Sequence, residues 1–399
     1  MAISLNSSPS SQYHFAYRPV VWTVSGNDAT VVRCIADVYI NGTYVSTYEK
    51  SPDLGETDVF TFDFQSVLQD NLKAFEPAFT ASTAKMYADT NAGLYYNVRF
   101  FEILDNGTTY DTSWAADGAG TSYLDSASTY NPAFAYNSTL RHEETQDLSI
   151  YKTGGTYAGM HRLNKITTTF AAQNTNKARK IKRGDFAILS TWHSTASTIQ
   201  GRINQYDSTP SNISNTNSTA LASASRLWHY GVDTSTLLSN CDTFLQRIES
   251  TTPSAITDYC YWKVIENCND YVSLYWQNDL GGIDYYLFRD GQVKTIQGES
   301  ETYTKPLTTS FNTYDFGTTV LNKKGMTGVN AVSEVLDRTE ADALSNLFTH
   351  GVRAWIYSNS QFIPVIIADG GIDTINTMEG IYRASIELVY SNDLIAQRF

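Results

Sequence analysis

Charged residues are scarce in this chain, and so are proline, cysteine and long apolar runs. Only 17% of its 399 residues are charged, against about 25% in an average soluble protein. No run approaches the ~18 consecutive apolar residues that span a bilayer, so we expect no membrane contact. The first residues, MAISLNSSPSSQYHFAYRPV, have neither the charged start nor the apolar stretch of a secretory signal, which predicts an intracellular origin.

The cysteines and histidines form no pattern that holds a metal. Four cysteines, Cys34, Cys241, Cys260 and Cys268, are too sparse for a disulfide scaffold and form no CxxC pair. The six histidines form no HxH, HxxxH or HExxH grouping. We therefore expect the cysteines to be small buried residues or unpaired thiols. We expect no metal site and no cofactor.

Common catalytic motifs are also missing. The chain has no G-x-S-x-G nucleophile elbow, no GxxxxGK[ST] phosphate loop and no GxGxxG after a predicted strand. The glycine pairs at 154–155, 281–282 and 370–371 are better explained by turns that need positive φ. We predict that the protein is not an enzyme. A polysaccharide hydrolase, whose two carboxylates would meet only in the fold, is kept as an alternative.

Aromatic residues are what the chain has in excess. They make up 13% of it, with 27 Tyr against 18 Phe and 7 Trp. Aromatic residues are enriched in subunit interfaces, whose buried centres are poor in charge. We favour this interpretation over ordinary use in a β core and over stacking against sugars. The net charge of −13 argues against a protein that binds nucleic acid over a broad surface.

Strand and hairpin patterns dominate the sequence. Within Val31–Tyr48, apolar residues alternate with polar ones on both sides of Asn41-Gly42. This dipeptide favours a type I′ turn because both residues accept positive φ. A similar pattern surrounds Asn106-Gly107. Further strands are predicted at 19–25, 57–63, 186–191, 197–206, 259–265, 272–277, 285–289, 353–357, 362–367 and 384–390.

Helical patterns are few. Phe64–Phe75 has apolar residues at helical spacing. Thr339–His350 begins with Thr339 and Asp342 spaced as in a capping box, and Gly351 follows where a helix commonly ends. So few helices among so many strands predict an all-β protein of several β-sandwich or barrel-like domains, with two or three short helices.

Composition shifts divide the chain into three predicted domains. These are a β-sandwich-like N-terminal domain at 1–150, a middle β domain with a long polar loop at 151–255, and a C-terminal β domain with one capped helix at 256–399. Ala115–Tyr136 is rich in Ala, Gly, Ser and Asp, which predicts a long loop or linker. Ser208–Ser225 is low in both charge and hydrophobicity, which predicts an exposed loop between strands.

The strongest charge feature is the basic segment, which we define as residues 177–183, KARKIKR. Its basic residues are Lys177, Arg179, Lys180, Lys182 and Arg183. The simplest interpretation is a solvated hairpin tip or edge strand, where Lys discourages unwanted pairing. The candidate function is an electrostatic contact between subunits. A contact with the phosphates of nucleic acid is the least favoured of the three interpretations.

Three stretches of the chain resemble a known group of proteins. They are Tyr275–Phe288 (YWQNDLGGIDYYLF), the C-terminal block with FIPVIIAD at 362–369 and SIELVYSND at 385–393, and the hairpin and helix start within Pro19–Leu72. Together they resemble structural proteins of tailed phages of Bacteroidetes, including crAss-like phages. The resemblance covers about half of the chain and leaves residues 151–255 unmatched.

The resemblance implies a virion protein of the tail or neck, such as a tail-hub or ring protein, that is made in the host cytoplasm. Its partners would be further copies of itself and neighbouring tail, neck or portal-side proteins. Ring subunits join head to tail through two different surfaces, and the basic segment of an acidic chain is a candidate for one of them. The alternative is a tail-fibre or receptor-binding protein that recognises host surface glycans. Fibres usually show repeats or heptads, and neither is found in this sequence.

Overall fold

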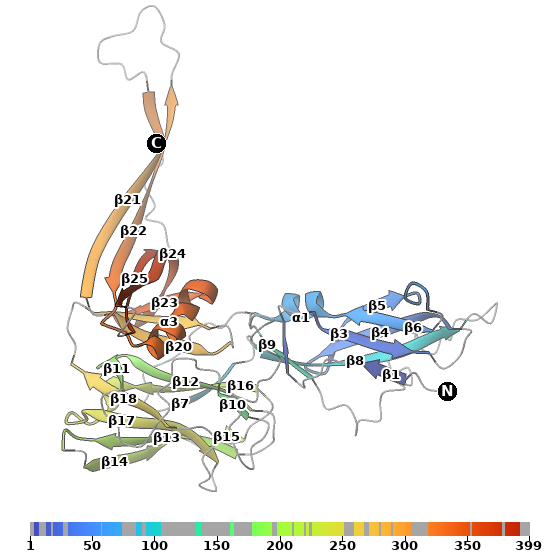
Figure 1. The fold of residues 1–399 in the computed structure, drawn as a ribbon, viewed down its shortest axis with the longest axis horizontal. Coiled ribbons are helices and arrows are strands. Elements are labelled where there is room, and N and C mark those ends of the chain that lie inside the picture. Colours follow the sequence, from blue (N-terminus) through green and yellow to red (C-terminus); the bar gives the residue numbers. More distant parts are fainter. Residues whose placement is uncertain are drawn as a thin grey trace, which may run out of the picture.

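The computed structural model groups the strands that it describes into five sheets (Figure 1). The described residues are 4–7, 13–16, 19–26, 31–56, 58–73, 85–89, 93–104, 133–136, 160–162, 178–193, 198–209, 211–218, 221–222, 226–250, 259–266, 271–278, 281–288, 290–304, 318–351, 353–376 and 380–391. Among them strands dominate and only two α-helices occur, so the predicted all-β multidomain class is confirmed. Neither of these helices has the length and apolar character needed to cross a membrane.

Two sheets near the N-terminus form a β-sandwich. The smaller sheet has the order β1 (Ser4–Ser7), β3 (Val21–Ser25) and β6 (Val59–Asp63). The larger has the order β2 (Tyr13–Phe15), β9 (Ala133–Tyr136), β8 (Gly93–Leu104), β4 (Val31–Ile40) and β5 (Thr43–Lys50). Aromatic side chains such as Phe60, Phe62 and Phe100 fill the space between the sheets, and Figure 1 shows the sandwich to one side of the other sheets.

The predicted features of this sandwich are found where the structure describes them. Asn41 and Gly42 have φ of +51° and +79° and connect β4 to β5, so this hairpin is confirmed. The first predicted helix is confirmed as α1 (Gln65–Asn71), which adds Val67 and Leu68 to the core. The hairpin predicted at 106–107 lies outside the described residues.

Two further sheets are built mainly from the middle of the chain, and we call them the middle sheets. The smaller has the order β10 (Met160–Arg162), β12 (Phe186–His193), β16 (Arg226–Asp233) and β7 (Lys85–Asp89). The larger contains β11 (Arg179–Lys182), β18 (Cys260–Ile265), β17 (Thr243–Ser250), β13 (Thr198–Tyr206), β14 (Asn212–Asn217) and β15 (Leu221–Ala222). Side chains from both sheets, including Ile188, Tyr230, Phe244 and Ile248, share one hydrophobic core.

The middle sheets extend across both expected domain boundaries. Strand β7, from within the first predicted domain, pairs with β16. Strand β18, which follows the expected boundary at 255, pairs with β17 and β11. Composition shifts mark loops, whereas sheet membership is decided by pairing between strands that are far apart in the sequence.

The predicted loop at Ser208–Ser225 is wrong over much of its length. Residues Asn212–Asn217 form β14, which pairs antiparallel with β13 from Arg202↔Asn217 onward. Strand β14 lies at the sheet edge and is largely exposed, so its side chains can be polar without breaking a core. The predicted linker Ala115–Tyr136 ends in strand β9, and the rest of it lies outside the described residues.

The fifth sheet is C-terminal and has helix α3 (Arg338–His350) on one face. Its strand order is β20 (Ile283–Phe288), β19 (Val272–Gln277), β23 (Ala354–Ser358), β24 (Gln361–Asn376), β25 (Ile381–Tyr390), β22 (Thr318–Val332) and β21 (Asp290–Thr304). Side chains alternate along β19: Tyr275 joins the core of the middle sheets, whereas Leu274 and Trp276 join the core beneath α3. The sheet is thus buried on both faces in this region.

Helix α3 is confirmed, but its predicted cap is wrong. The N-cap is Asp337, whose side chain accepts from the backbone N–H of Glu340 at 2.8 Å, and the Glu340 carboxylate accepts from the N–H of Asp337 at 3.1 Å. This capping box starts two residues before Thr339, because Arg338 already has helical geometry. Gly351 ends the helix, as predicted.

Candidate functional site

The basic segment lies on an edge strand of the larger middle sheet. Lys177 is outside the described residues, whereas Arg179, Lys180 and Lys182 belong to β11, which pairs in parallel with β18 at this edge. Arg183 begins the turn from β11 into β12. The segment is therefore an edge strand followed by a turn, but it is partly buried and not the solvated strand that the simplest interpretation predicted.

Arg179 extends from β11 to the C-terminal sheet. Its guanidinium Nη2 donates to the carbonyl oxygen of Tyr285 on β20. The guanidinium carbon lies 4.7 Å from the ring centroid of Trp262 on β18. A flat guanidinium can stack on a ring with its face and donate with its edge. Arg179 thus connects a middle strand with a C-terminal strand.

Lys180 makes a second contact with the C-terminal region. Its ammonium group pairs with the carboxylate of Glu334, which lies between β22 and α3. The two side chains are 38% and 28% exposed. Ion pairs that water reaches contribute at most about 1 kcal/mol. This pair therefore helps to fix the relative position of the two regions more than it stabilises the fold.

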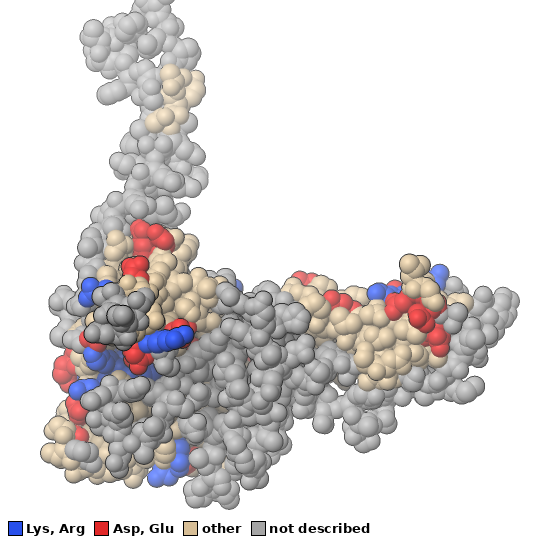
Figure 2. Space-filling model, in the orientation of Figure 1, with Lys and Arg blue, Asp and Glu red and all other residues tan. Residues whose placement is uncertain are grey.

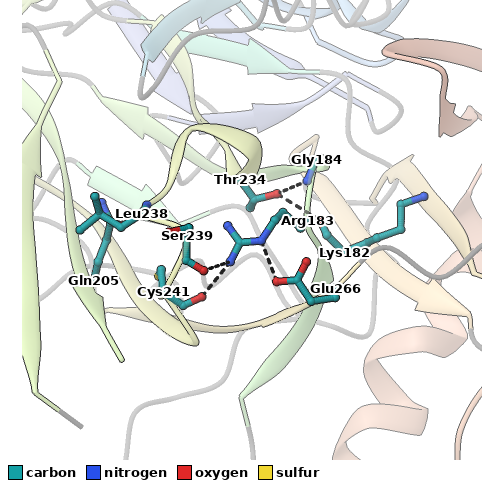
Figure 3. A network of polar contacts seen from close by, with 9 residues as sticks. All are labelled: Lys182, Arg183, Gly184, Gln205, Thr234, Leu238, Ser239, Cys241 and Glu266. Atoms are coloured by element: carbon teal, nitrogen blue, oxygen red, sulfur yellow. Dashed lines mark hydrogen bonds and ion pairs between the residues drawn. The ribbon is translucent and has the colours of Figure 1, made fainter. Parts of the chain in front are cut away.

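Arg183 is at the centre of the polar network in Figure 3. Its Nε donates to the Glu266 carboxylate at 2.9 Å, and its Nη2 donates to the carbonyl oxygens of Ser239 and Cys241 at 3.4 and 3.1 Å. The Arg183 side chain is only 18% exposed, whereas that of Glu266 is 77% exposed. The arginine thus ties the turn after β11 to the loop that precedes β17.

The basic segment therefore serves a junction within this chain. Arg179, Lys180 and Arg183 all have partners in this chain, on the C-terminal sheet, in the 333–337 connection and in the middle sheets. A contact between this segment and a second subunit stays a prediction.

A buried carboxylate lies at the same junction. Asp185 is 1% exposed. It follows Gly184, whose backbone φ of +99° is rarely adopted by residues that have a side chain. Its Oδ2 accepts from the hydroxyls of Ser273 on β19 and Tyr285 on β20, the latter at 2.9 Å. Its Oδ1 accepts no hydrogen bond from the residues that the structure describes.

Burial dominates the electrostatics of this carboxylate. It raises the pKa of Asp185 from its ordinary 3.8 to about 6, and the Ser273 hydroxyl, the charge of Lys182 and the Tyr285 hydroxyl offset only part of that rise. Burial likewise raises the pKa of Tyr275 and of Tyr285 well above 10.0. Both phenols are therefore neutral hydrogen-bonding groups at ordinary pH.

Aromatic rings surround Asp185 and connect the sheets. The Tyr275 hydroxyl both accepts from the N–H and donates to the carbonyl oxygen of Phe186, each at 2.9 Å. The Tyr275 ring packs on Tyr285 and on Phe362 at centroid distances of 4.8 and 5.0 Å. Tyr275 on β19 and Tyr285 on β20 therefore supply much of the packing between the middle and C-terminal sheets.

The hydrophobic cores of the N-terminal sandwich and of the middle sheets explain part of the tyrosine surplus. Tyr96, Tyr230, Tyr275 and Tyr285 are among the largest side chains that the fold buries completely. These four serve the interior of this chain, so for them the interpretation as subunit-interface residues is wrong. The sequence could not separate the two uses, because both bury an aromatic ring.

A serine, a histidine and an aspartate form a second buried cluster. Ser190 Oγ lies 2.9 Å from His229 Nδ1, and His229 Nε2 lies 3.2 Å from Asp89 Oδ2. Ser190 and His229 are 0% exposed and Asp89 is 5% exposed. Ser190 Oγ also accepts from the backbone N–H of Ile283 at 3.0 Å. The cluster thus connects β7, β12, β16 and β20.

This arrangement differs from a catalytic Ser-His-Asp triad in two respects. In the hydrolase triad the serine bonds to Nε2 and the aspartate to Nδ1, whereas here the two ring nitrogens have exchanged partners. The Ser190 hydroxyl is also buried, although a nucleophile must meet its substrate. The geometry fits a structural tie that satisfies polar groups inside the core.

The sequence offered no signal for either buried cluster. Asp185 meets Tyr285 across 100 positions of the chain, and His229 meets Asp89 across 140. No spacing rule covers such separations. The alternating pattern did predict the strand at 186–191, which begins directly after Asp185 and contains Ser190, and this strand is confirmed as β12.

Thiols and metal ligands add nothing to the site. Cys34, Cys241 and Cys260 are buried and form no disulfide with one another, and Cys268 lies outside the described residues. Within the described ranges, no three His, Cys, Asp or Glu side chains are grouped so that they could hold a metal ion.

No family model matches the chain, and no curated protein matches it.

Proposed function

We propose that this protein is a non-enzymatic structural subunit of a tailed-phage virion, which multimerises as a tail-hub or neck ring and joins neighbouring virion proteins. The observation that carries the proposal is the long hairpin formed by β21 and β22. It stands clear of the other sheets in Figure 1. The resemblance of Tyr275–Phe288 and of the C-terminal block to phage structural proteins supports the same function.

The outer part of this hairpin has only two strands. Strands β21 and β22 pair from Asp290↔Val332 to Thr304↔Thr318, whereas β25 pairs with β22 only over Gly328–Val332. Within the described chain, residues 318–327 therefore have β21 as their only neighbour. At about 3.3 Å per residue, this two-stranded part extends roughly 30 Å beyond the third strand.

A ribbon of this kind favours a partner. A two-stranded hairpin is marginally stable in water, and each outer edge presents N–H and C=O groups that another strand can pair with. Thr302, Tyr303 and Thr304 near its outer end are exposed, and Tyr303 retains 49% of its accessible surface. Strand addition from another chain would cover these edges.

A second copy of the chain is the partner that fits the topology. Strand β21 is the last strand of its sheet, and residues 318–327 of β22 have no second neighbouring strand in the part of the chain that the structure describes. If β21 of one copy lies beside β22 of the next, the antiparallel order continues from copy to copy. Each contact then joins two different surfaces, and such head-to-tail contacts close into a ring when the rotation between copies allows it.

Shortening the hairpin tests the assembly. We would replace residues 298–325 with Asn-Gly, which joins the paired residues Gln297 and Met326 through a two-residue turn. Native mass spectrometry should show a closed oligomer for the full chain and a monomer for this variant. A milder variant, with Asn-Gly joining the paired residues Ser300 and Lys323, should assemble more weakly than the full chain.

Two outcomes would contradict the proposed assembly. A full chain that remains monomeric at high concentration would overturn the ring. An oligomer of unchanged size in the variant that joins Gln297 to Met326, with an unchanged circular dichroism spectrum, would show that the hairpin does not hold the copies together. The phage assignment has its own test, which is mass spectrometry of purified virions. Absence of the protein from virions would exclude a virion role even if it assembles.

A further inference from the structure

We propose that Asp185 makes the junction between the middle and C-terminal sheets a pH-sensitive latch, which holds firmly in acid solution and loosens as the solution becomes neutral. The latch lies within a single chain and so does not depend on the assembly proposed above. Its consequence is that pH sets how firmly the C-terminal sheet, with its hairpin, is attached to the middle sheets.

The geometry places one carboxyl group where the two regions meet. Asp185 lies in the turn between β11 and β12, which are middle strands, and its two hydroxyl donors, Ser273 and Tyr285, are on the C-terminal strands β19 and β20. The side chain is 1% exposed, and its Oδ1 has no hydrogen-bond donor among the described residues. A negative charge at this position is therefore only partly compensated.

The groups that face Asp185 do not remove this cost. Lys182 on β11 attracts the negative charge of the Asp185 carboxylate, but this lysine is only partly buried, so water screens the attraction. Tyr275 on β19, Tyr285 on β20 and Tyr357 on β23 stay neutral, because burial raises the pKa of each phenol. Asp233 at the end of β16 is a further carboxylate, which acts on the Tyr357 phenol as Asp185 does, and it accepts from the N–H and hydroxyl of Ser235.

The sign of the effect follows from the direction of the pKa shift. Burial raises the pKa of Asp185 from 3.8 to about 6 in the closed junction. An open junction returns the carboxyl to water, where it loses its proton more readily. The stability that Asp185 gives to the closed junction is therefore fully present below pH 3.8 and is lost as the pH rises through about 6. Between pH 5.0 and 7.5, these two pKa values predict about a tenfold rise in the opening equilibrium.

Hydrogen–deuterium exchange of the full chain measures this opening directly. The amide of Phe186, which bonds to the Tyr275 hydroxyl, and the amide of Ile283, which bonds to Ser190, lie on the two sides of the junction. After correction for the intrinsic rate, their exchange should report about ten times more opening at pH 7.5 than at pH 5.0. Amides in β4 of the N-terminal sandwich serve as the internal reference.

Three variants make the experiment decisive. Asp185→Asn should abolish the pH dependence, because an amide does not titrate. Ser273→Ala removes a donor that favours the charged carboxylate, so its pH dependence should be steeper than that of the wild type. Asp233→Asn removes the neighbouring carboxylate and should keep the tenfold ratio. If the wild type shows equal opening at the two pH values, or Asp185→Asn keeps the tenfold ratio, the latch is overturned. If Asp185→Asn does not fold, a ratio in Ser273→Ala no larger than that of the wild type overturns it.

Discussion

The indole N–H of Trp262 donates to the side-chain oxygen of Gln246 at 2.9 Å inside the middle of the molecule. The amide nitrogen of the same glutamine donates to the carbonyl oxygens of Ala187 and Tyr230 at 3.1 and 2.8 Å. Gln246 is 0% exposed, and both hydrogens of its amide group and its oxygen are engaged. One buried amide thus joins the two middle sheets.

Replacing this amide should destabilise the protein strongly. Gln246→Leu keeps much of the volume but removes the acceptor of the Trp262 indole and the donor for two carbonyl oxygens. We expect a loss of about 3 kcal/mol in the free energy of unfolding, because buried groups without partners cost about 1–3 kcal/mol each. Urea unfolding followed by tryptophan fluorescence would measure it. The control is Gln361→Leu at an exposed position of β24, which should stay within about 0.5 kcal/mol of the wild type.

Gly201 on β13 should be intolerant of even a methyl group. A Cβ atom at this position would overlap the ring of Tyr230, which is 0% exposed and held in the core. We expect Gly201→Ala to cost about 3 kcal/mol, the upper end for overpacking a core. Gly371→Ala is the matched control, because its Cβ would meet nothing within 4 Å.

A double-mutant cycle separates the overlap with Tyr230 from any unfavourable effect of alanine in strand β13 that does not depend on that ring. Tyr230→Leu removes the ring that the new methyl group would strike, so the double variant should lose clearly less stability than the two single losses added together. Strict additivity of the two losses would show that the ring does not exclude the side chain at position 201.

Local patterns predicted the elements that local physics determines. The Asn41-Gly42 turn is a property of two residues that tolerate positive φ, and the predicted strand at 272–277 is confirmed as β19 without shift. Strand β14 replaces part of a predicted loop, because an edge strand with no buried residue has no apolar period in its sequence. The hairpin strands β21 and β22 were missed for a similar reason, since their polar sequences contain little apolar alternation.

The candidate site depends on contacts that no local pattern encodes. The basic segment was visible as a run of charge, but its partners Tyr285 and Glu334 lie more than a hundred positions away in the chain. Asp185 lies two residues after that run, and no local pattern marks it. Its importance comes from burial and from donors on two other strands, both of which are properties of the assembled sheets.

The cap of α3 can be tested against the cap that the sequence suggested. Asp337 accepts from the N–H of Glu340 at 2.8 Å, whereas Asp342 is 77% exposed and lies 4.0 Å from Arg338. Asp337→Ala should therefore cost about 1 kcal/mol, the usual value for losing an N-cap side chain. Asp342→Ala should cost no more than about 0.5 kcal/mol. Equal losses in the two variants, measured by urea unfolding, would argue against the capping box.

Arg183 offers a test of which of its contacts matters. Its Nε bonds to the exposed Glu266 carboxylate at 2.9 Å, and its Nη2 bonds to the carbonyl oxygens of Ser239 and Cys241. Ion pairs that water reaches contribute about 0–1 kcal/mol, whereas hydrogen bonds from a charged donor to neutral partners contribute about 1.5–3 kcal/mol. The two carbonyl contacts should therefore dominate.

Arg183→Ala should accordingly lower the free energy of unfolding by about 2 kcal/mol, whereas Glu266→Ala should lower it by less than about 0.5 kcal/mol. Added salt should lower the stability of the wild type slightly more than that of Glu266→Ala, because screening weakens the exposed ion pair that only the wild type has. Arg183→Lys keeps the charge but cannot reproduce the forked geometry, so it should behave more like Arg183→Ala than like the wild type. A loss in Glu266→Ala as large as that in Arg183→Ala would instead show that the ion pair holds the turn after β11 in place.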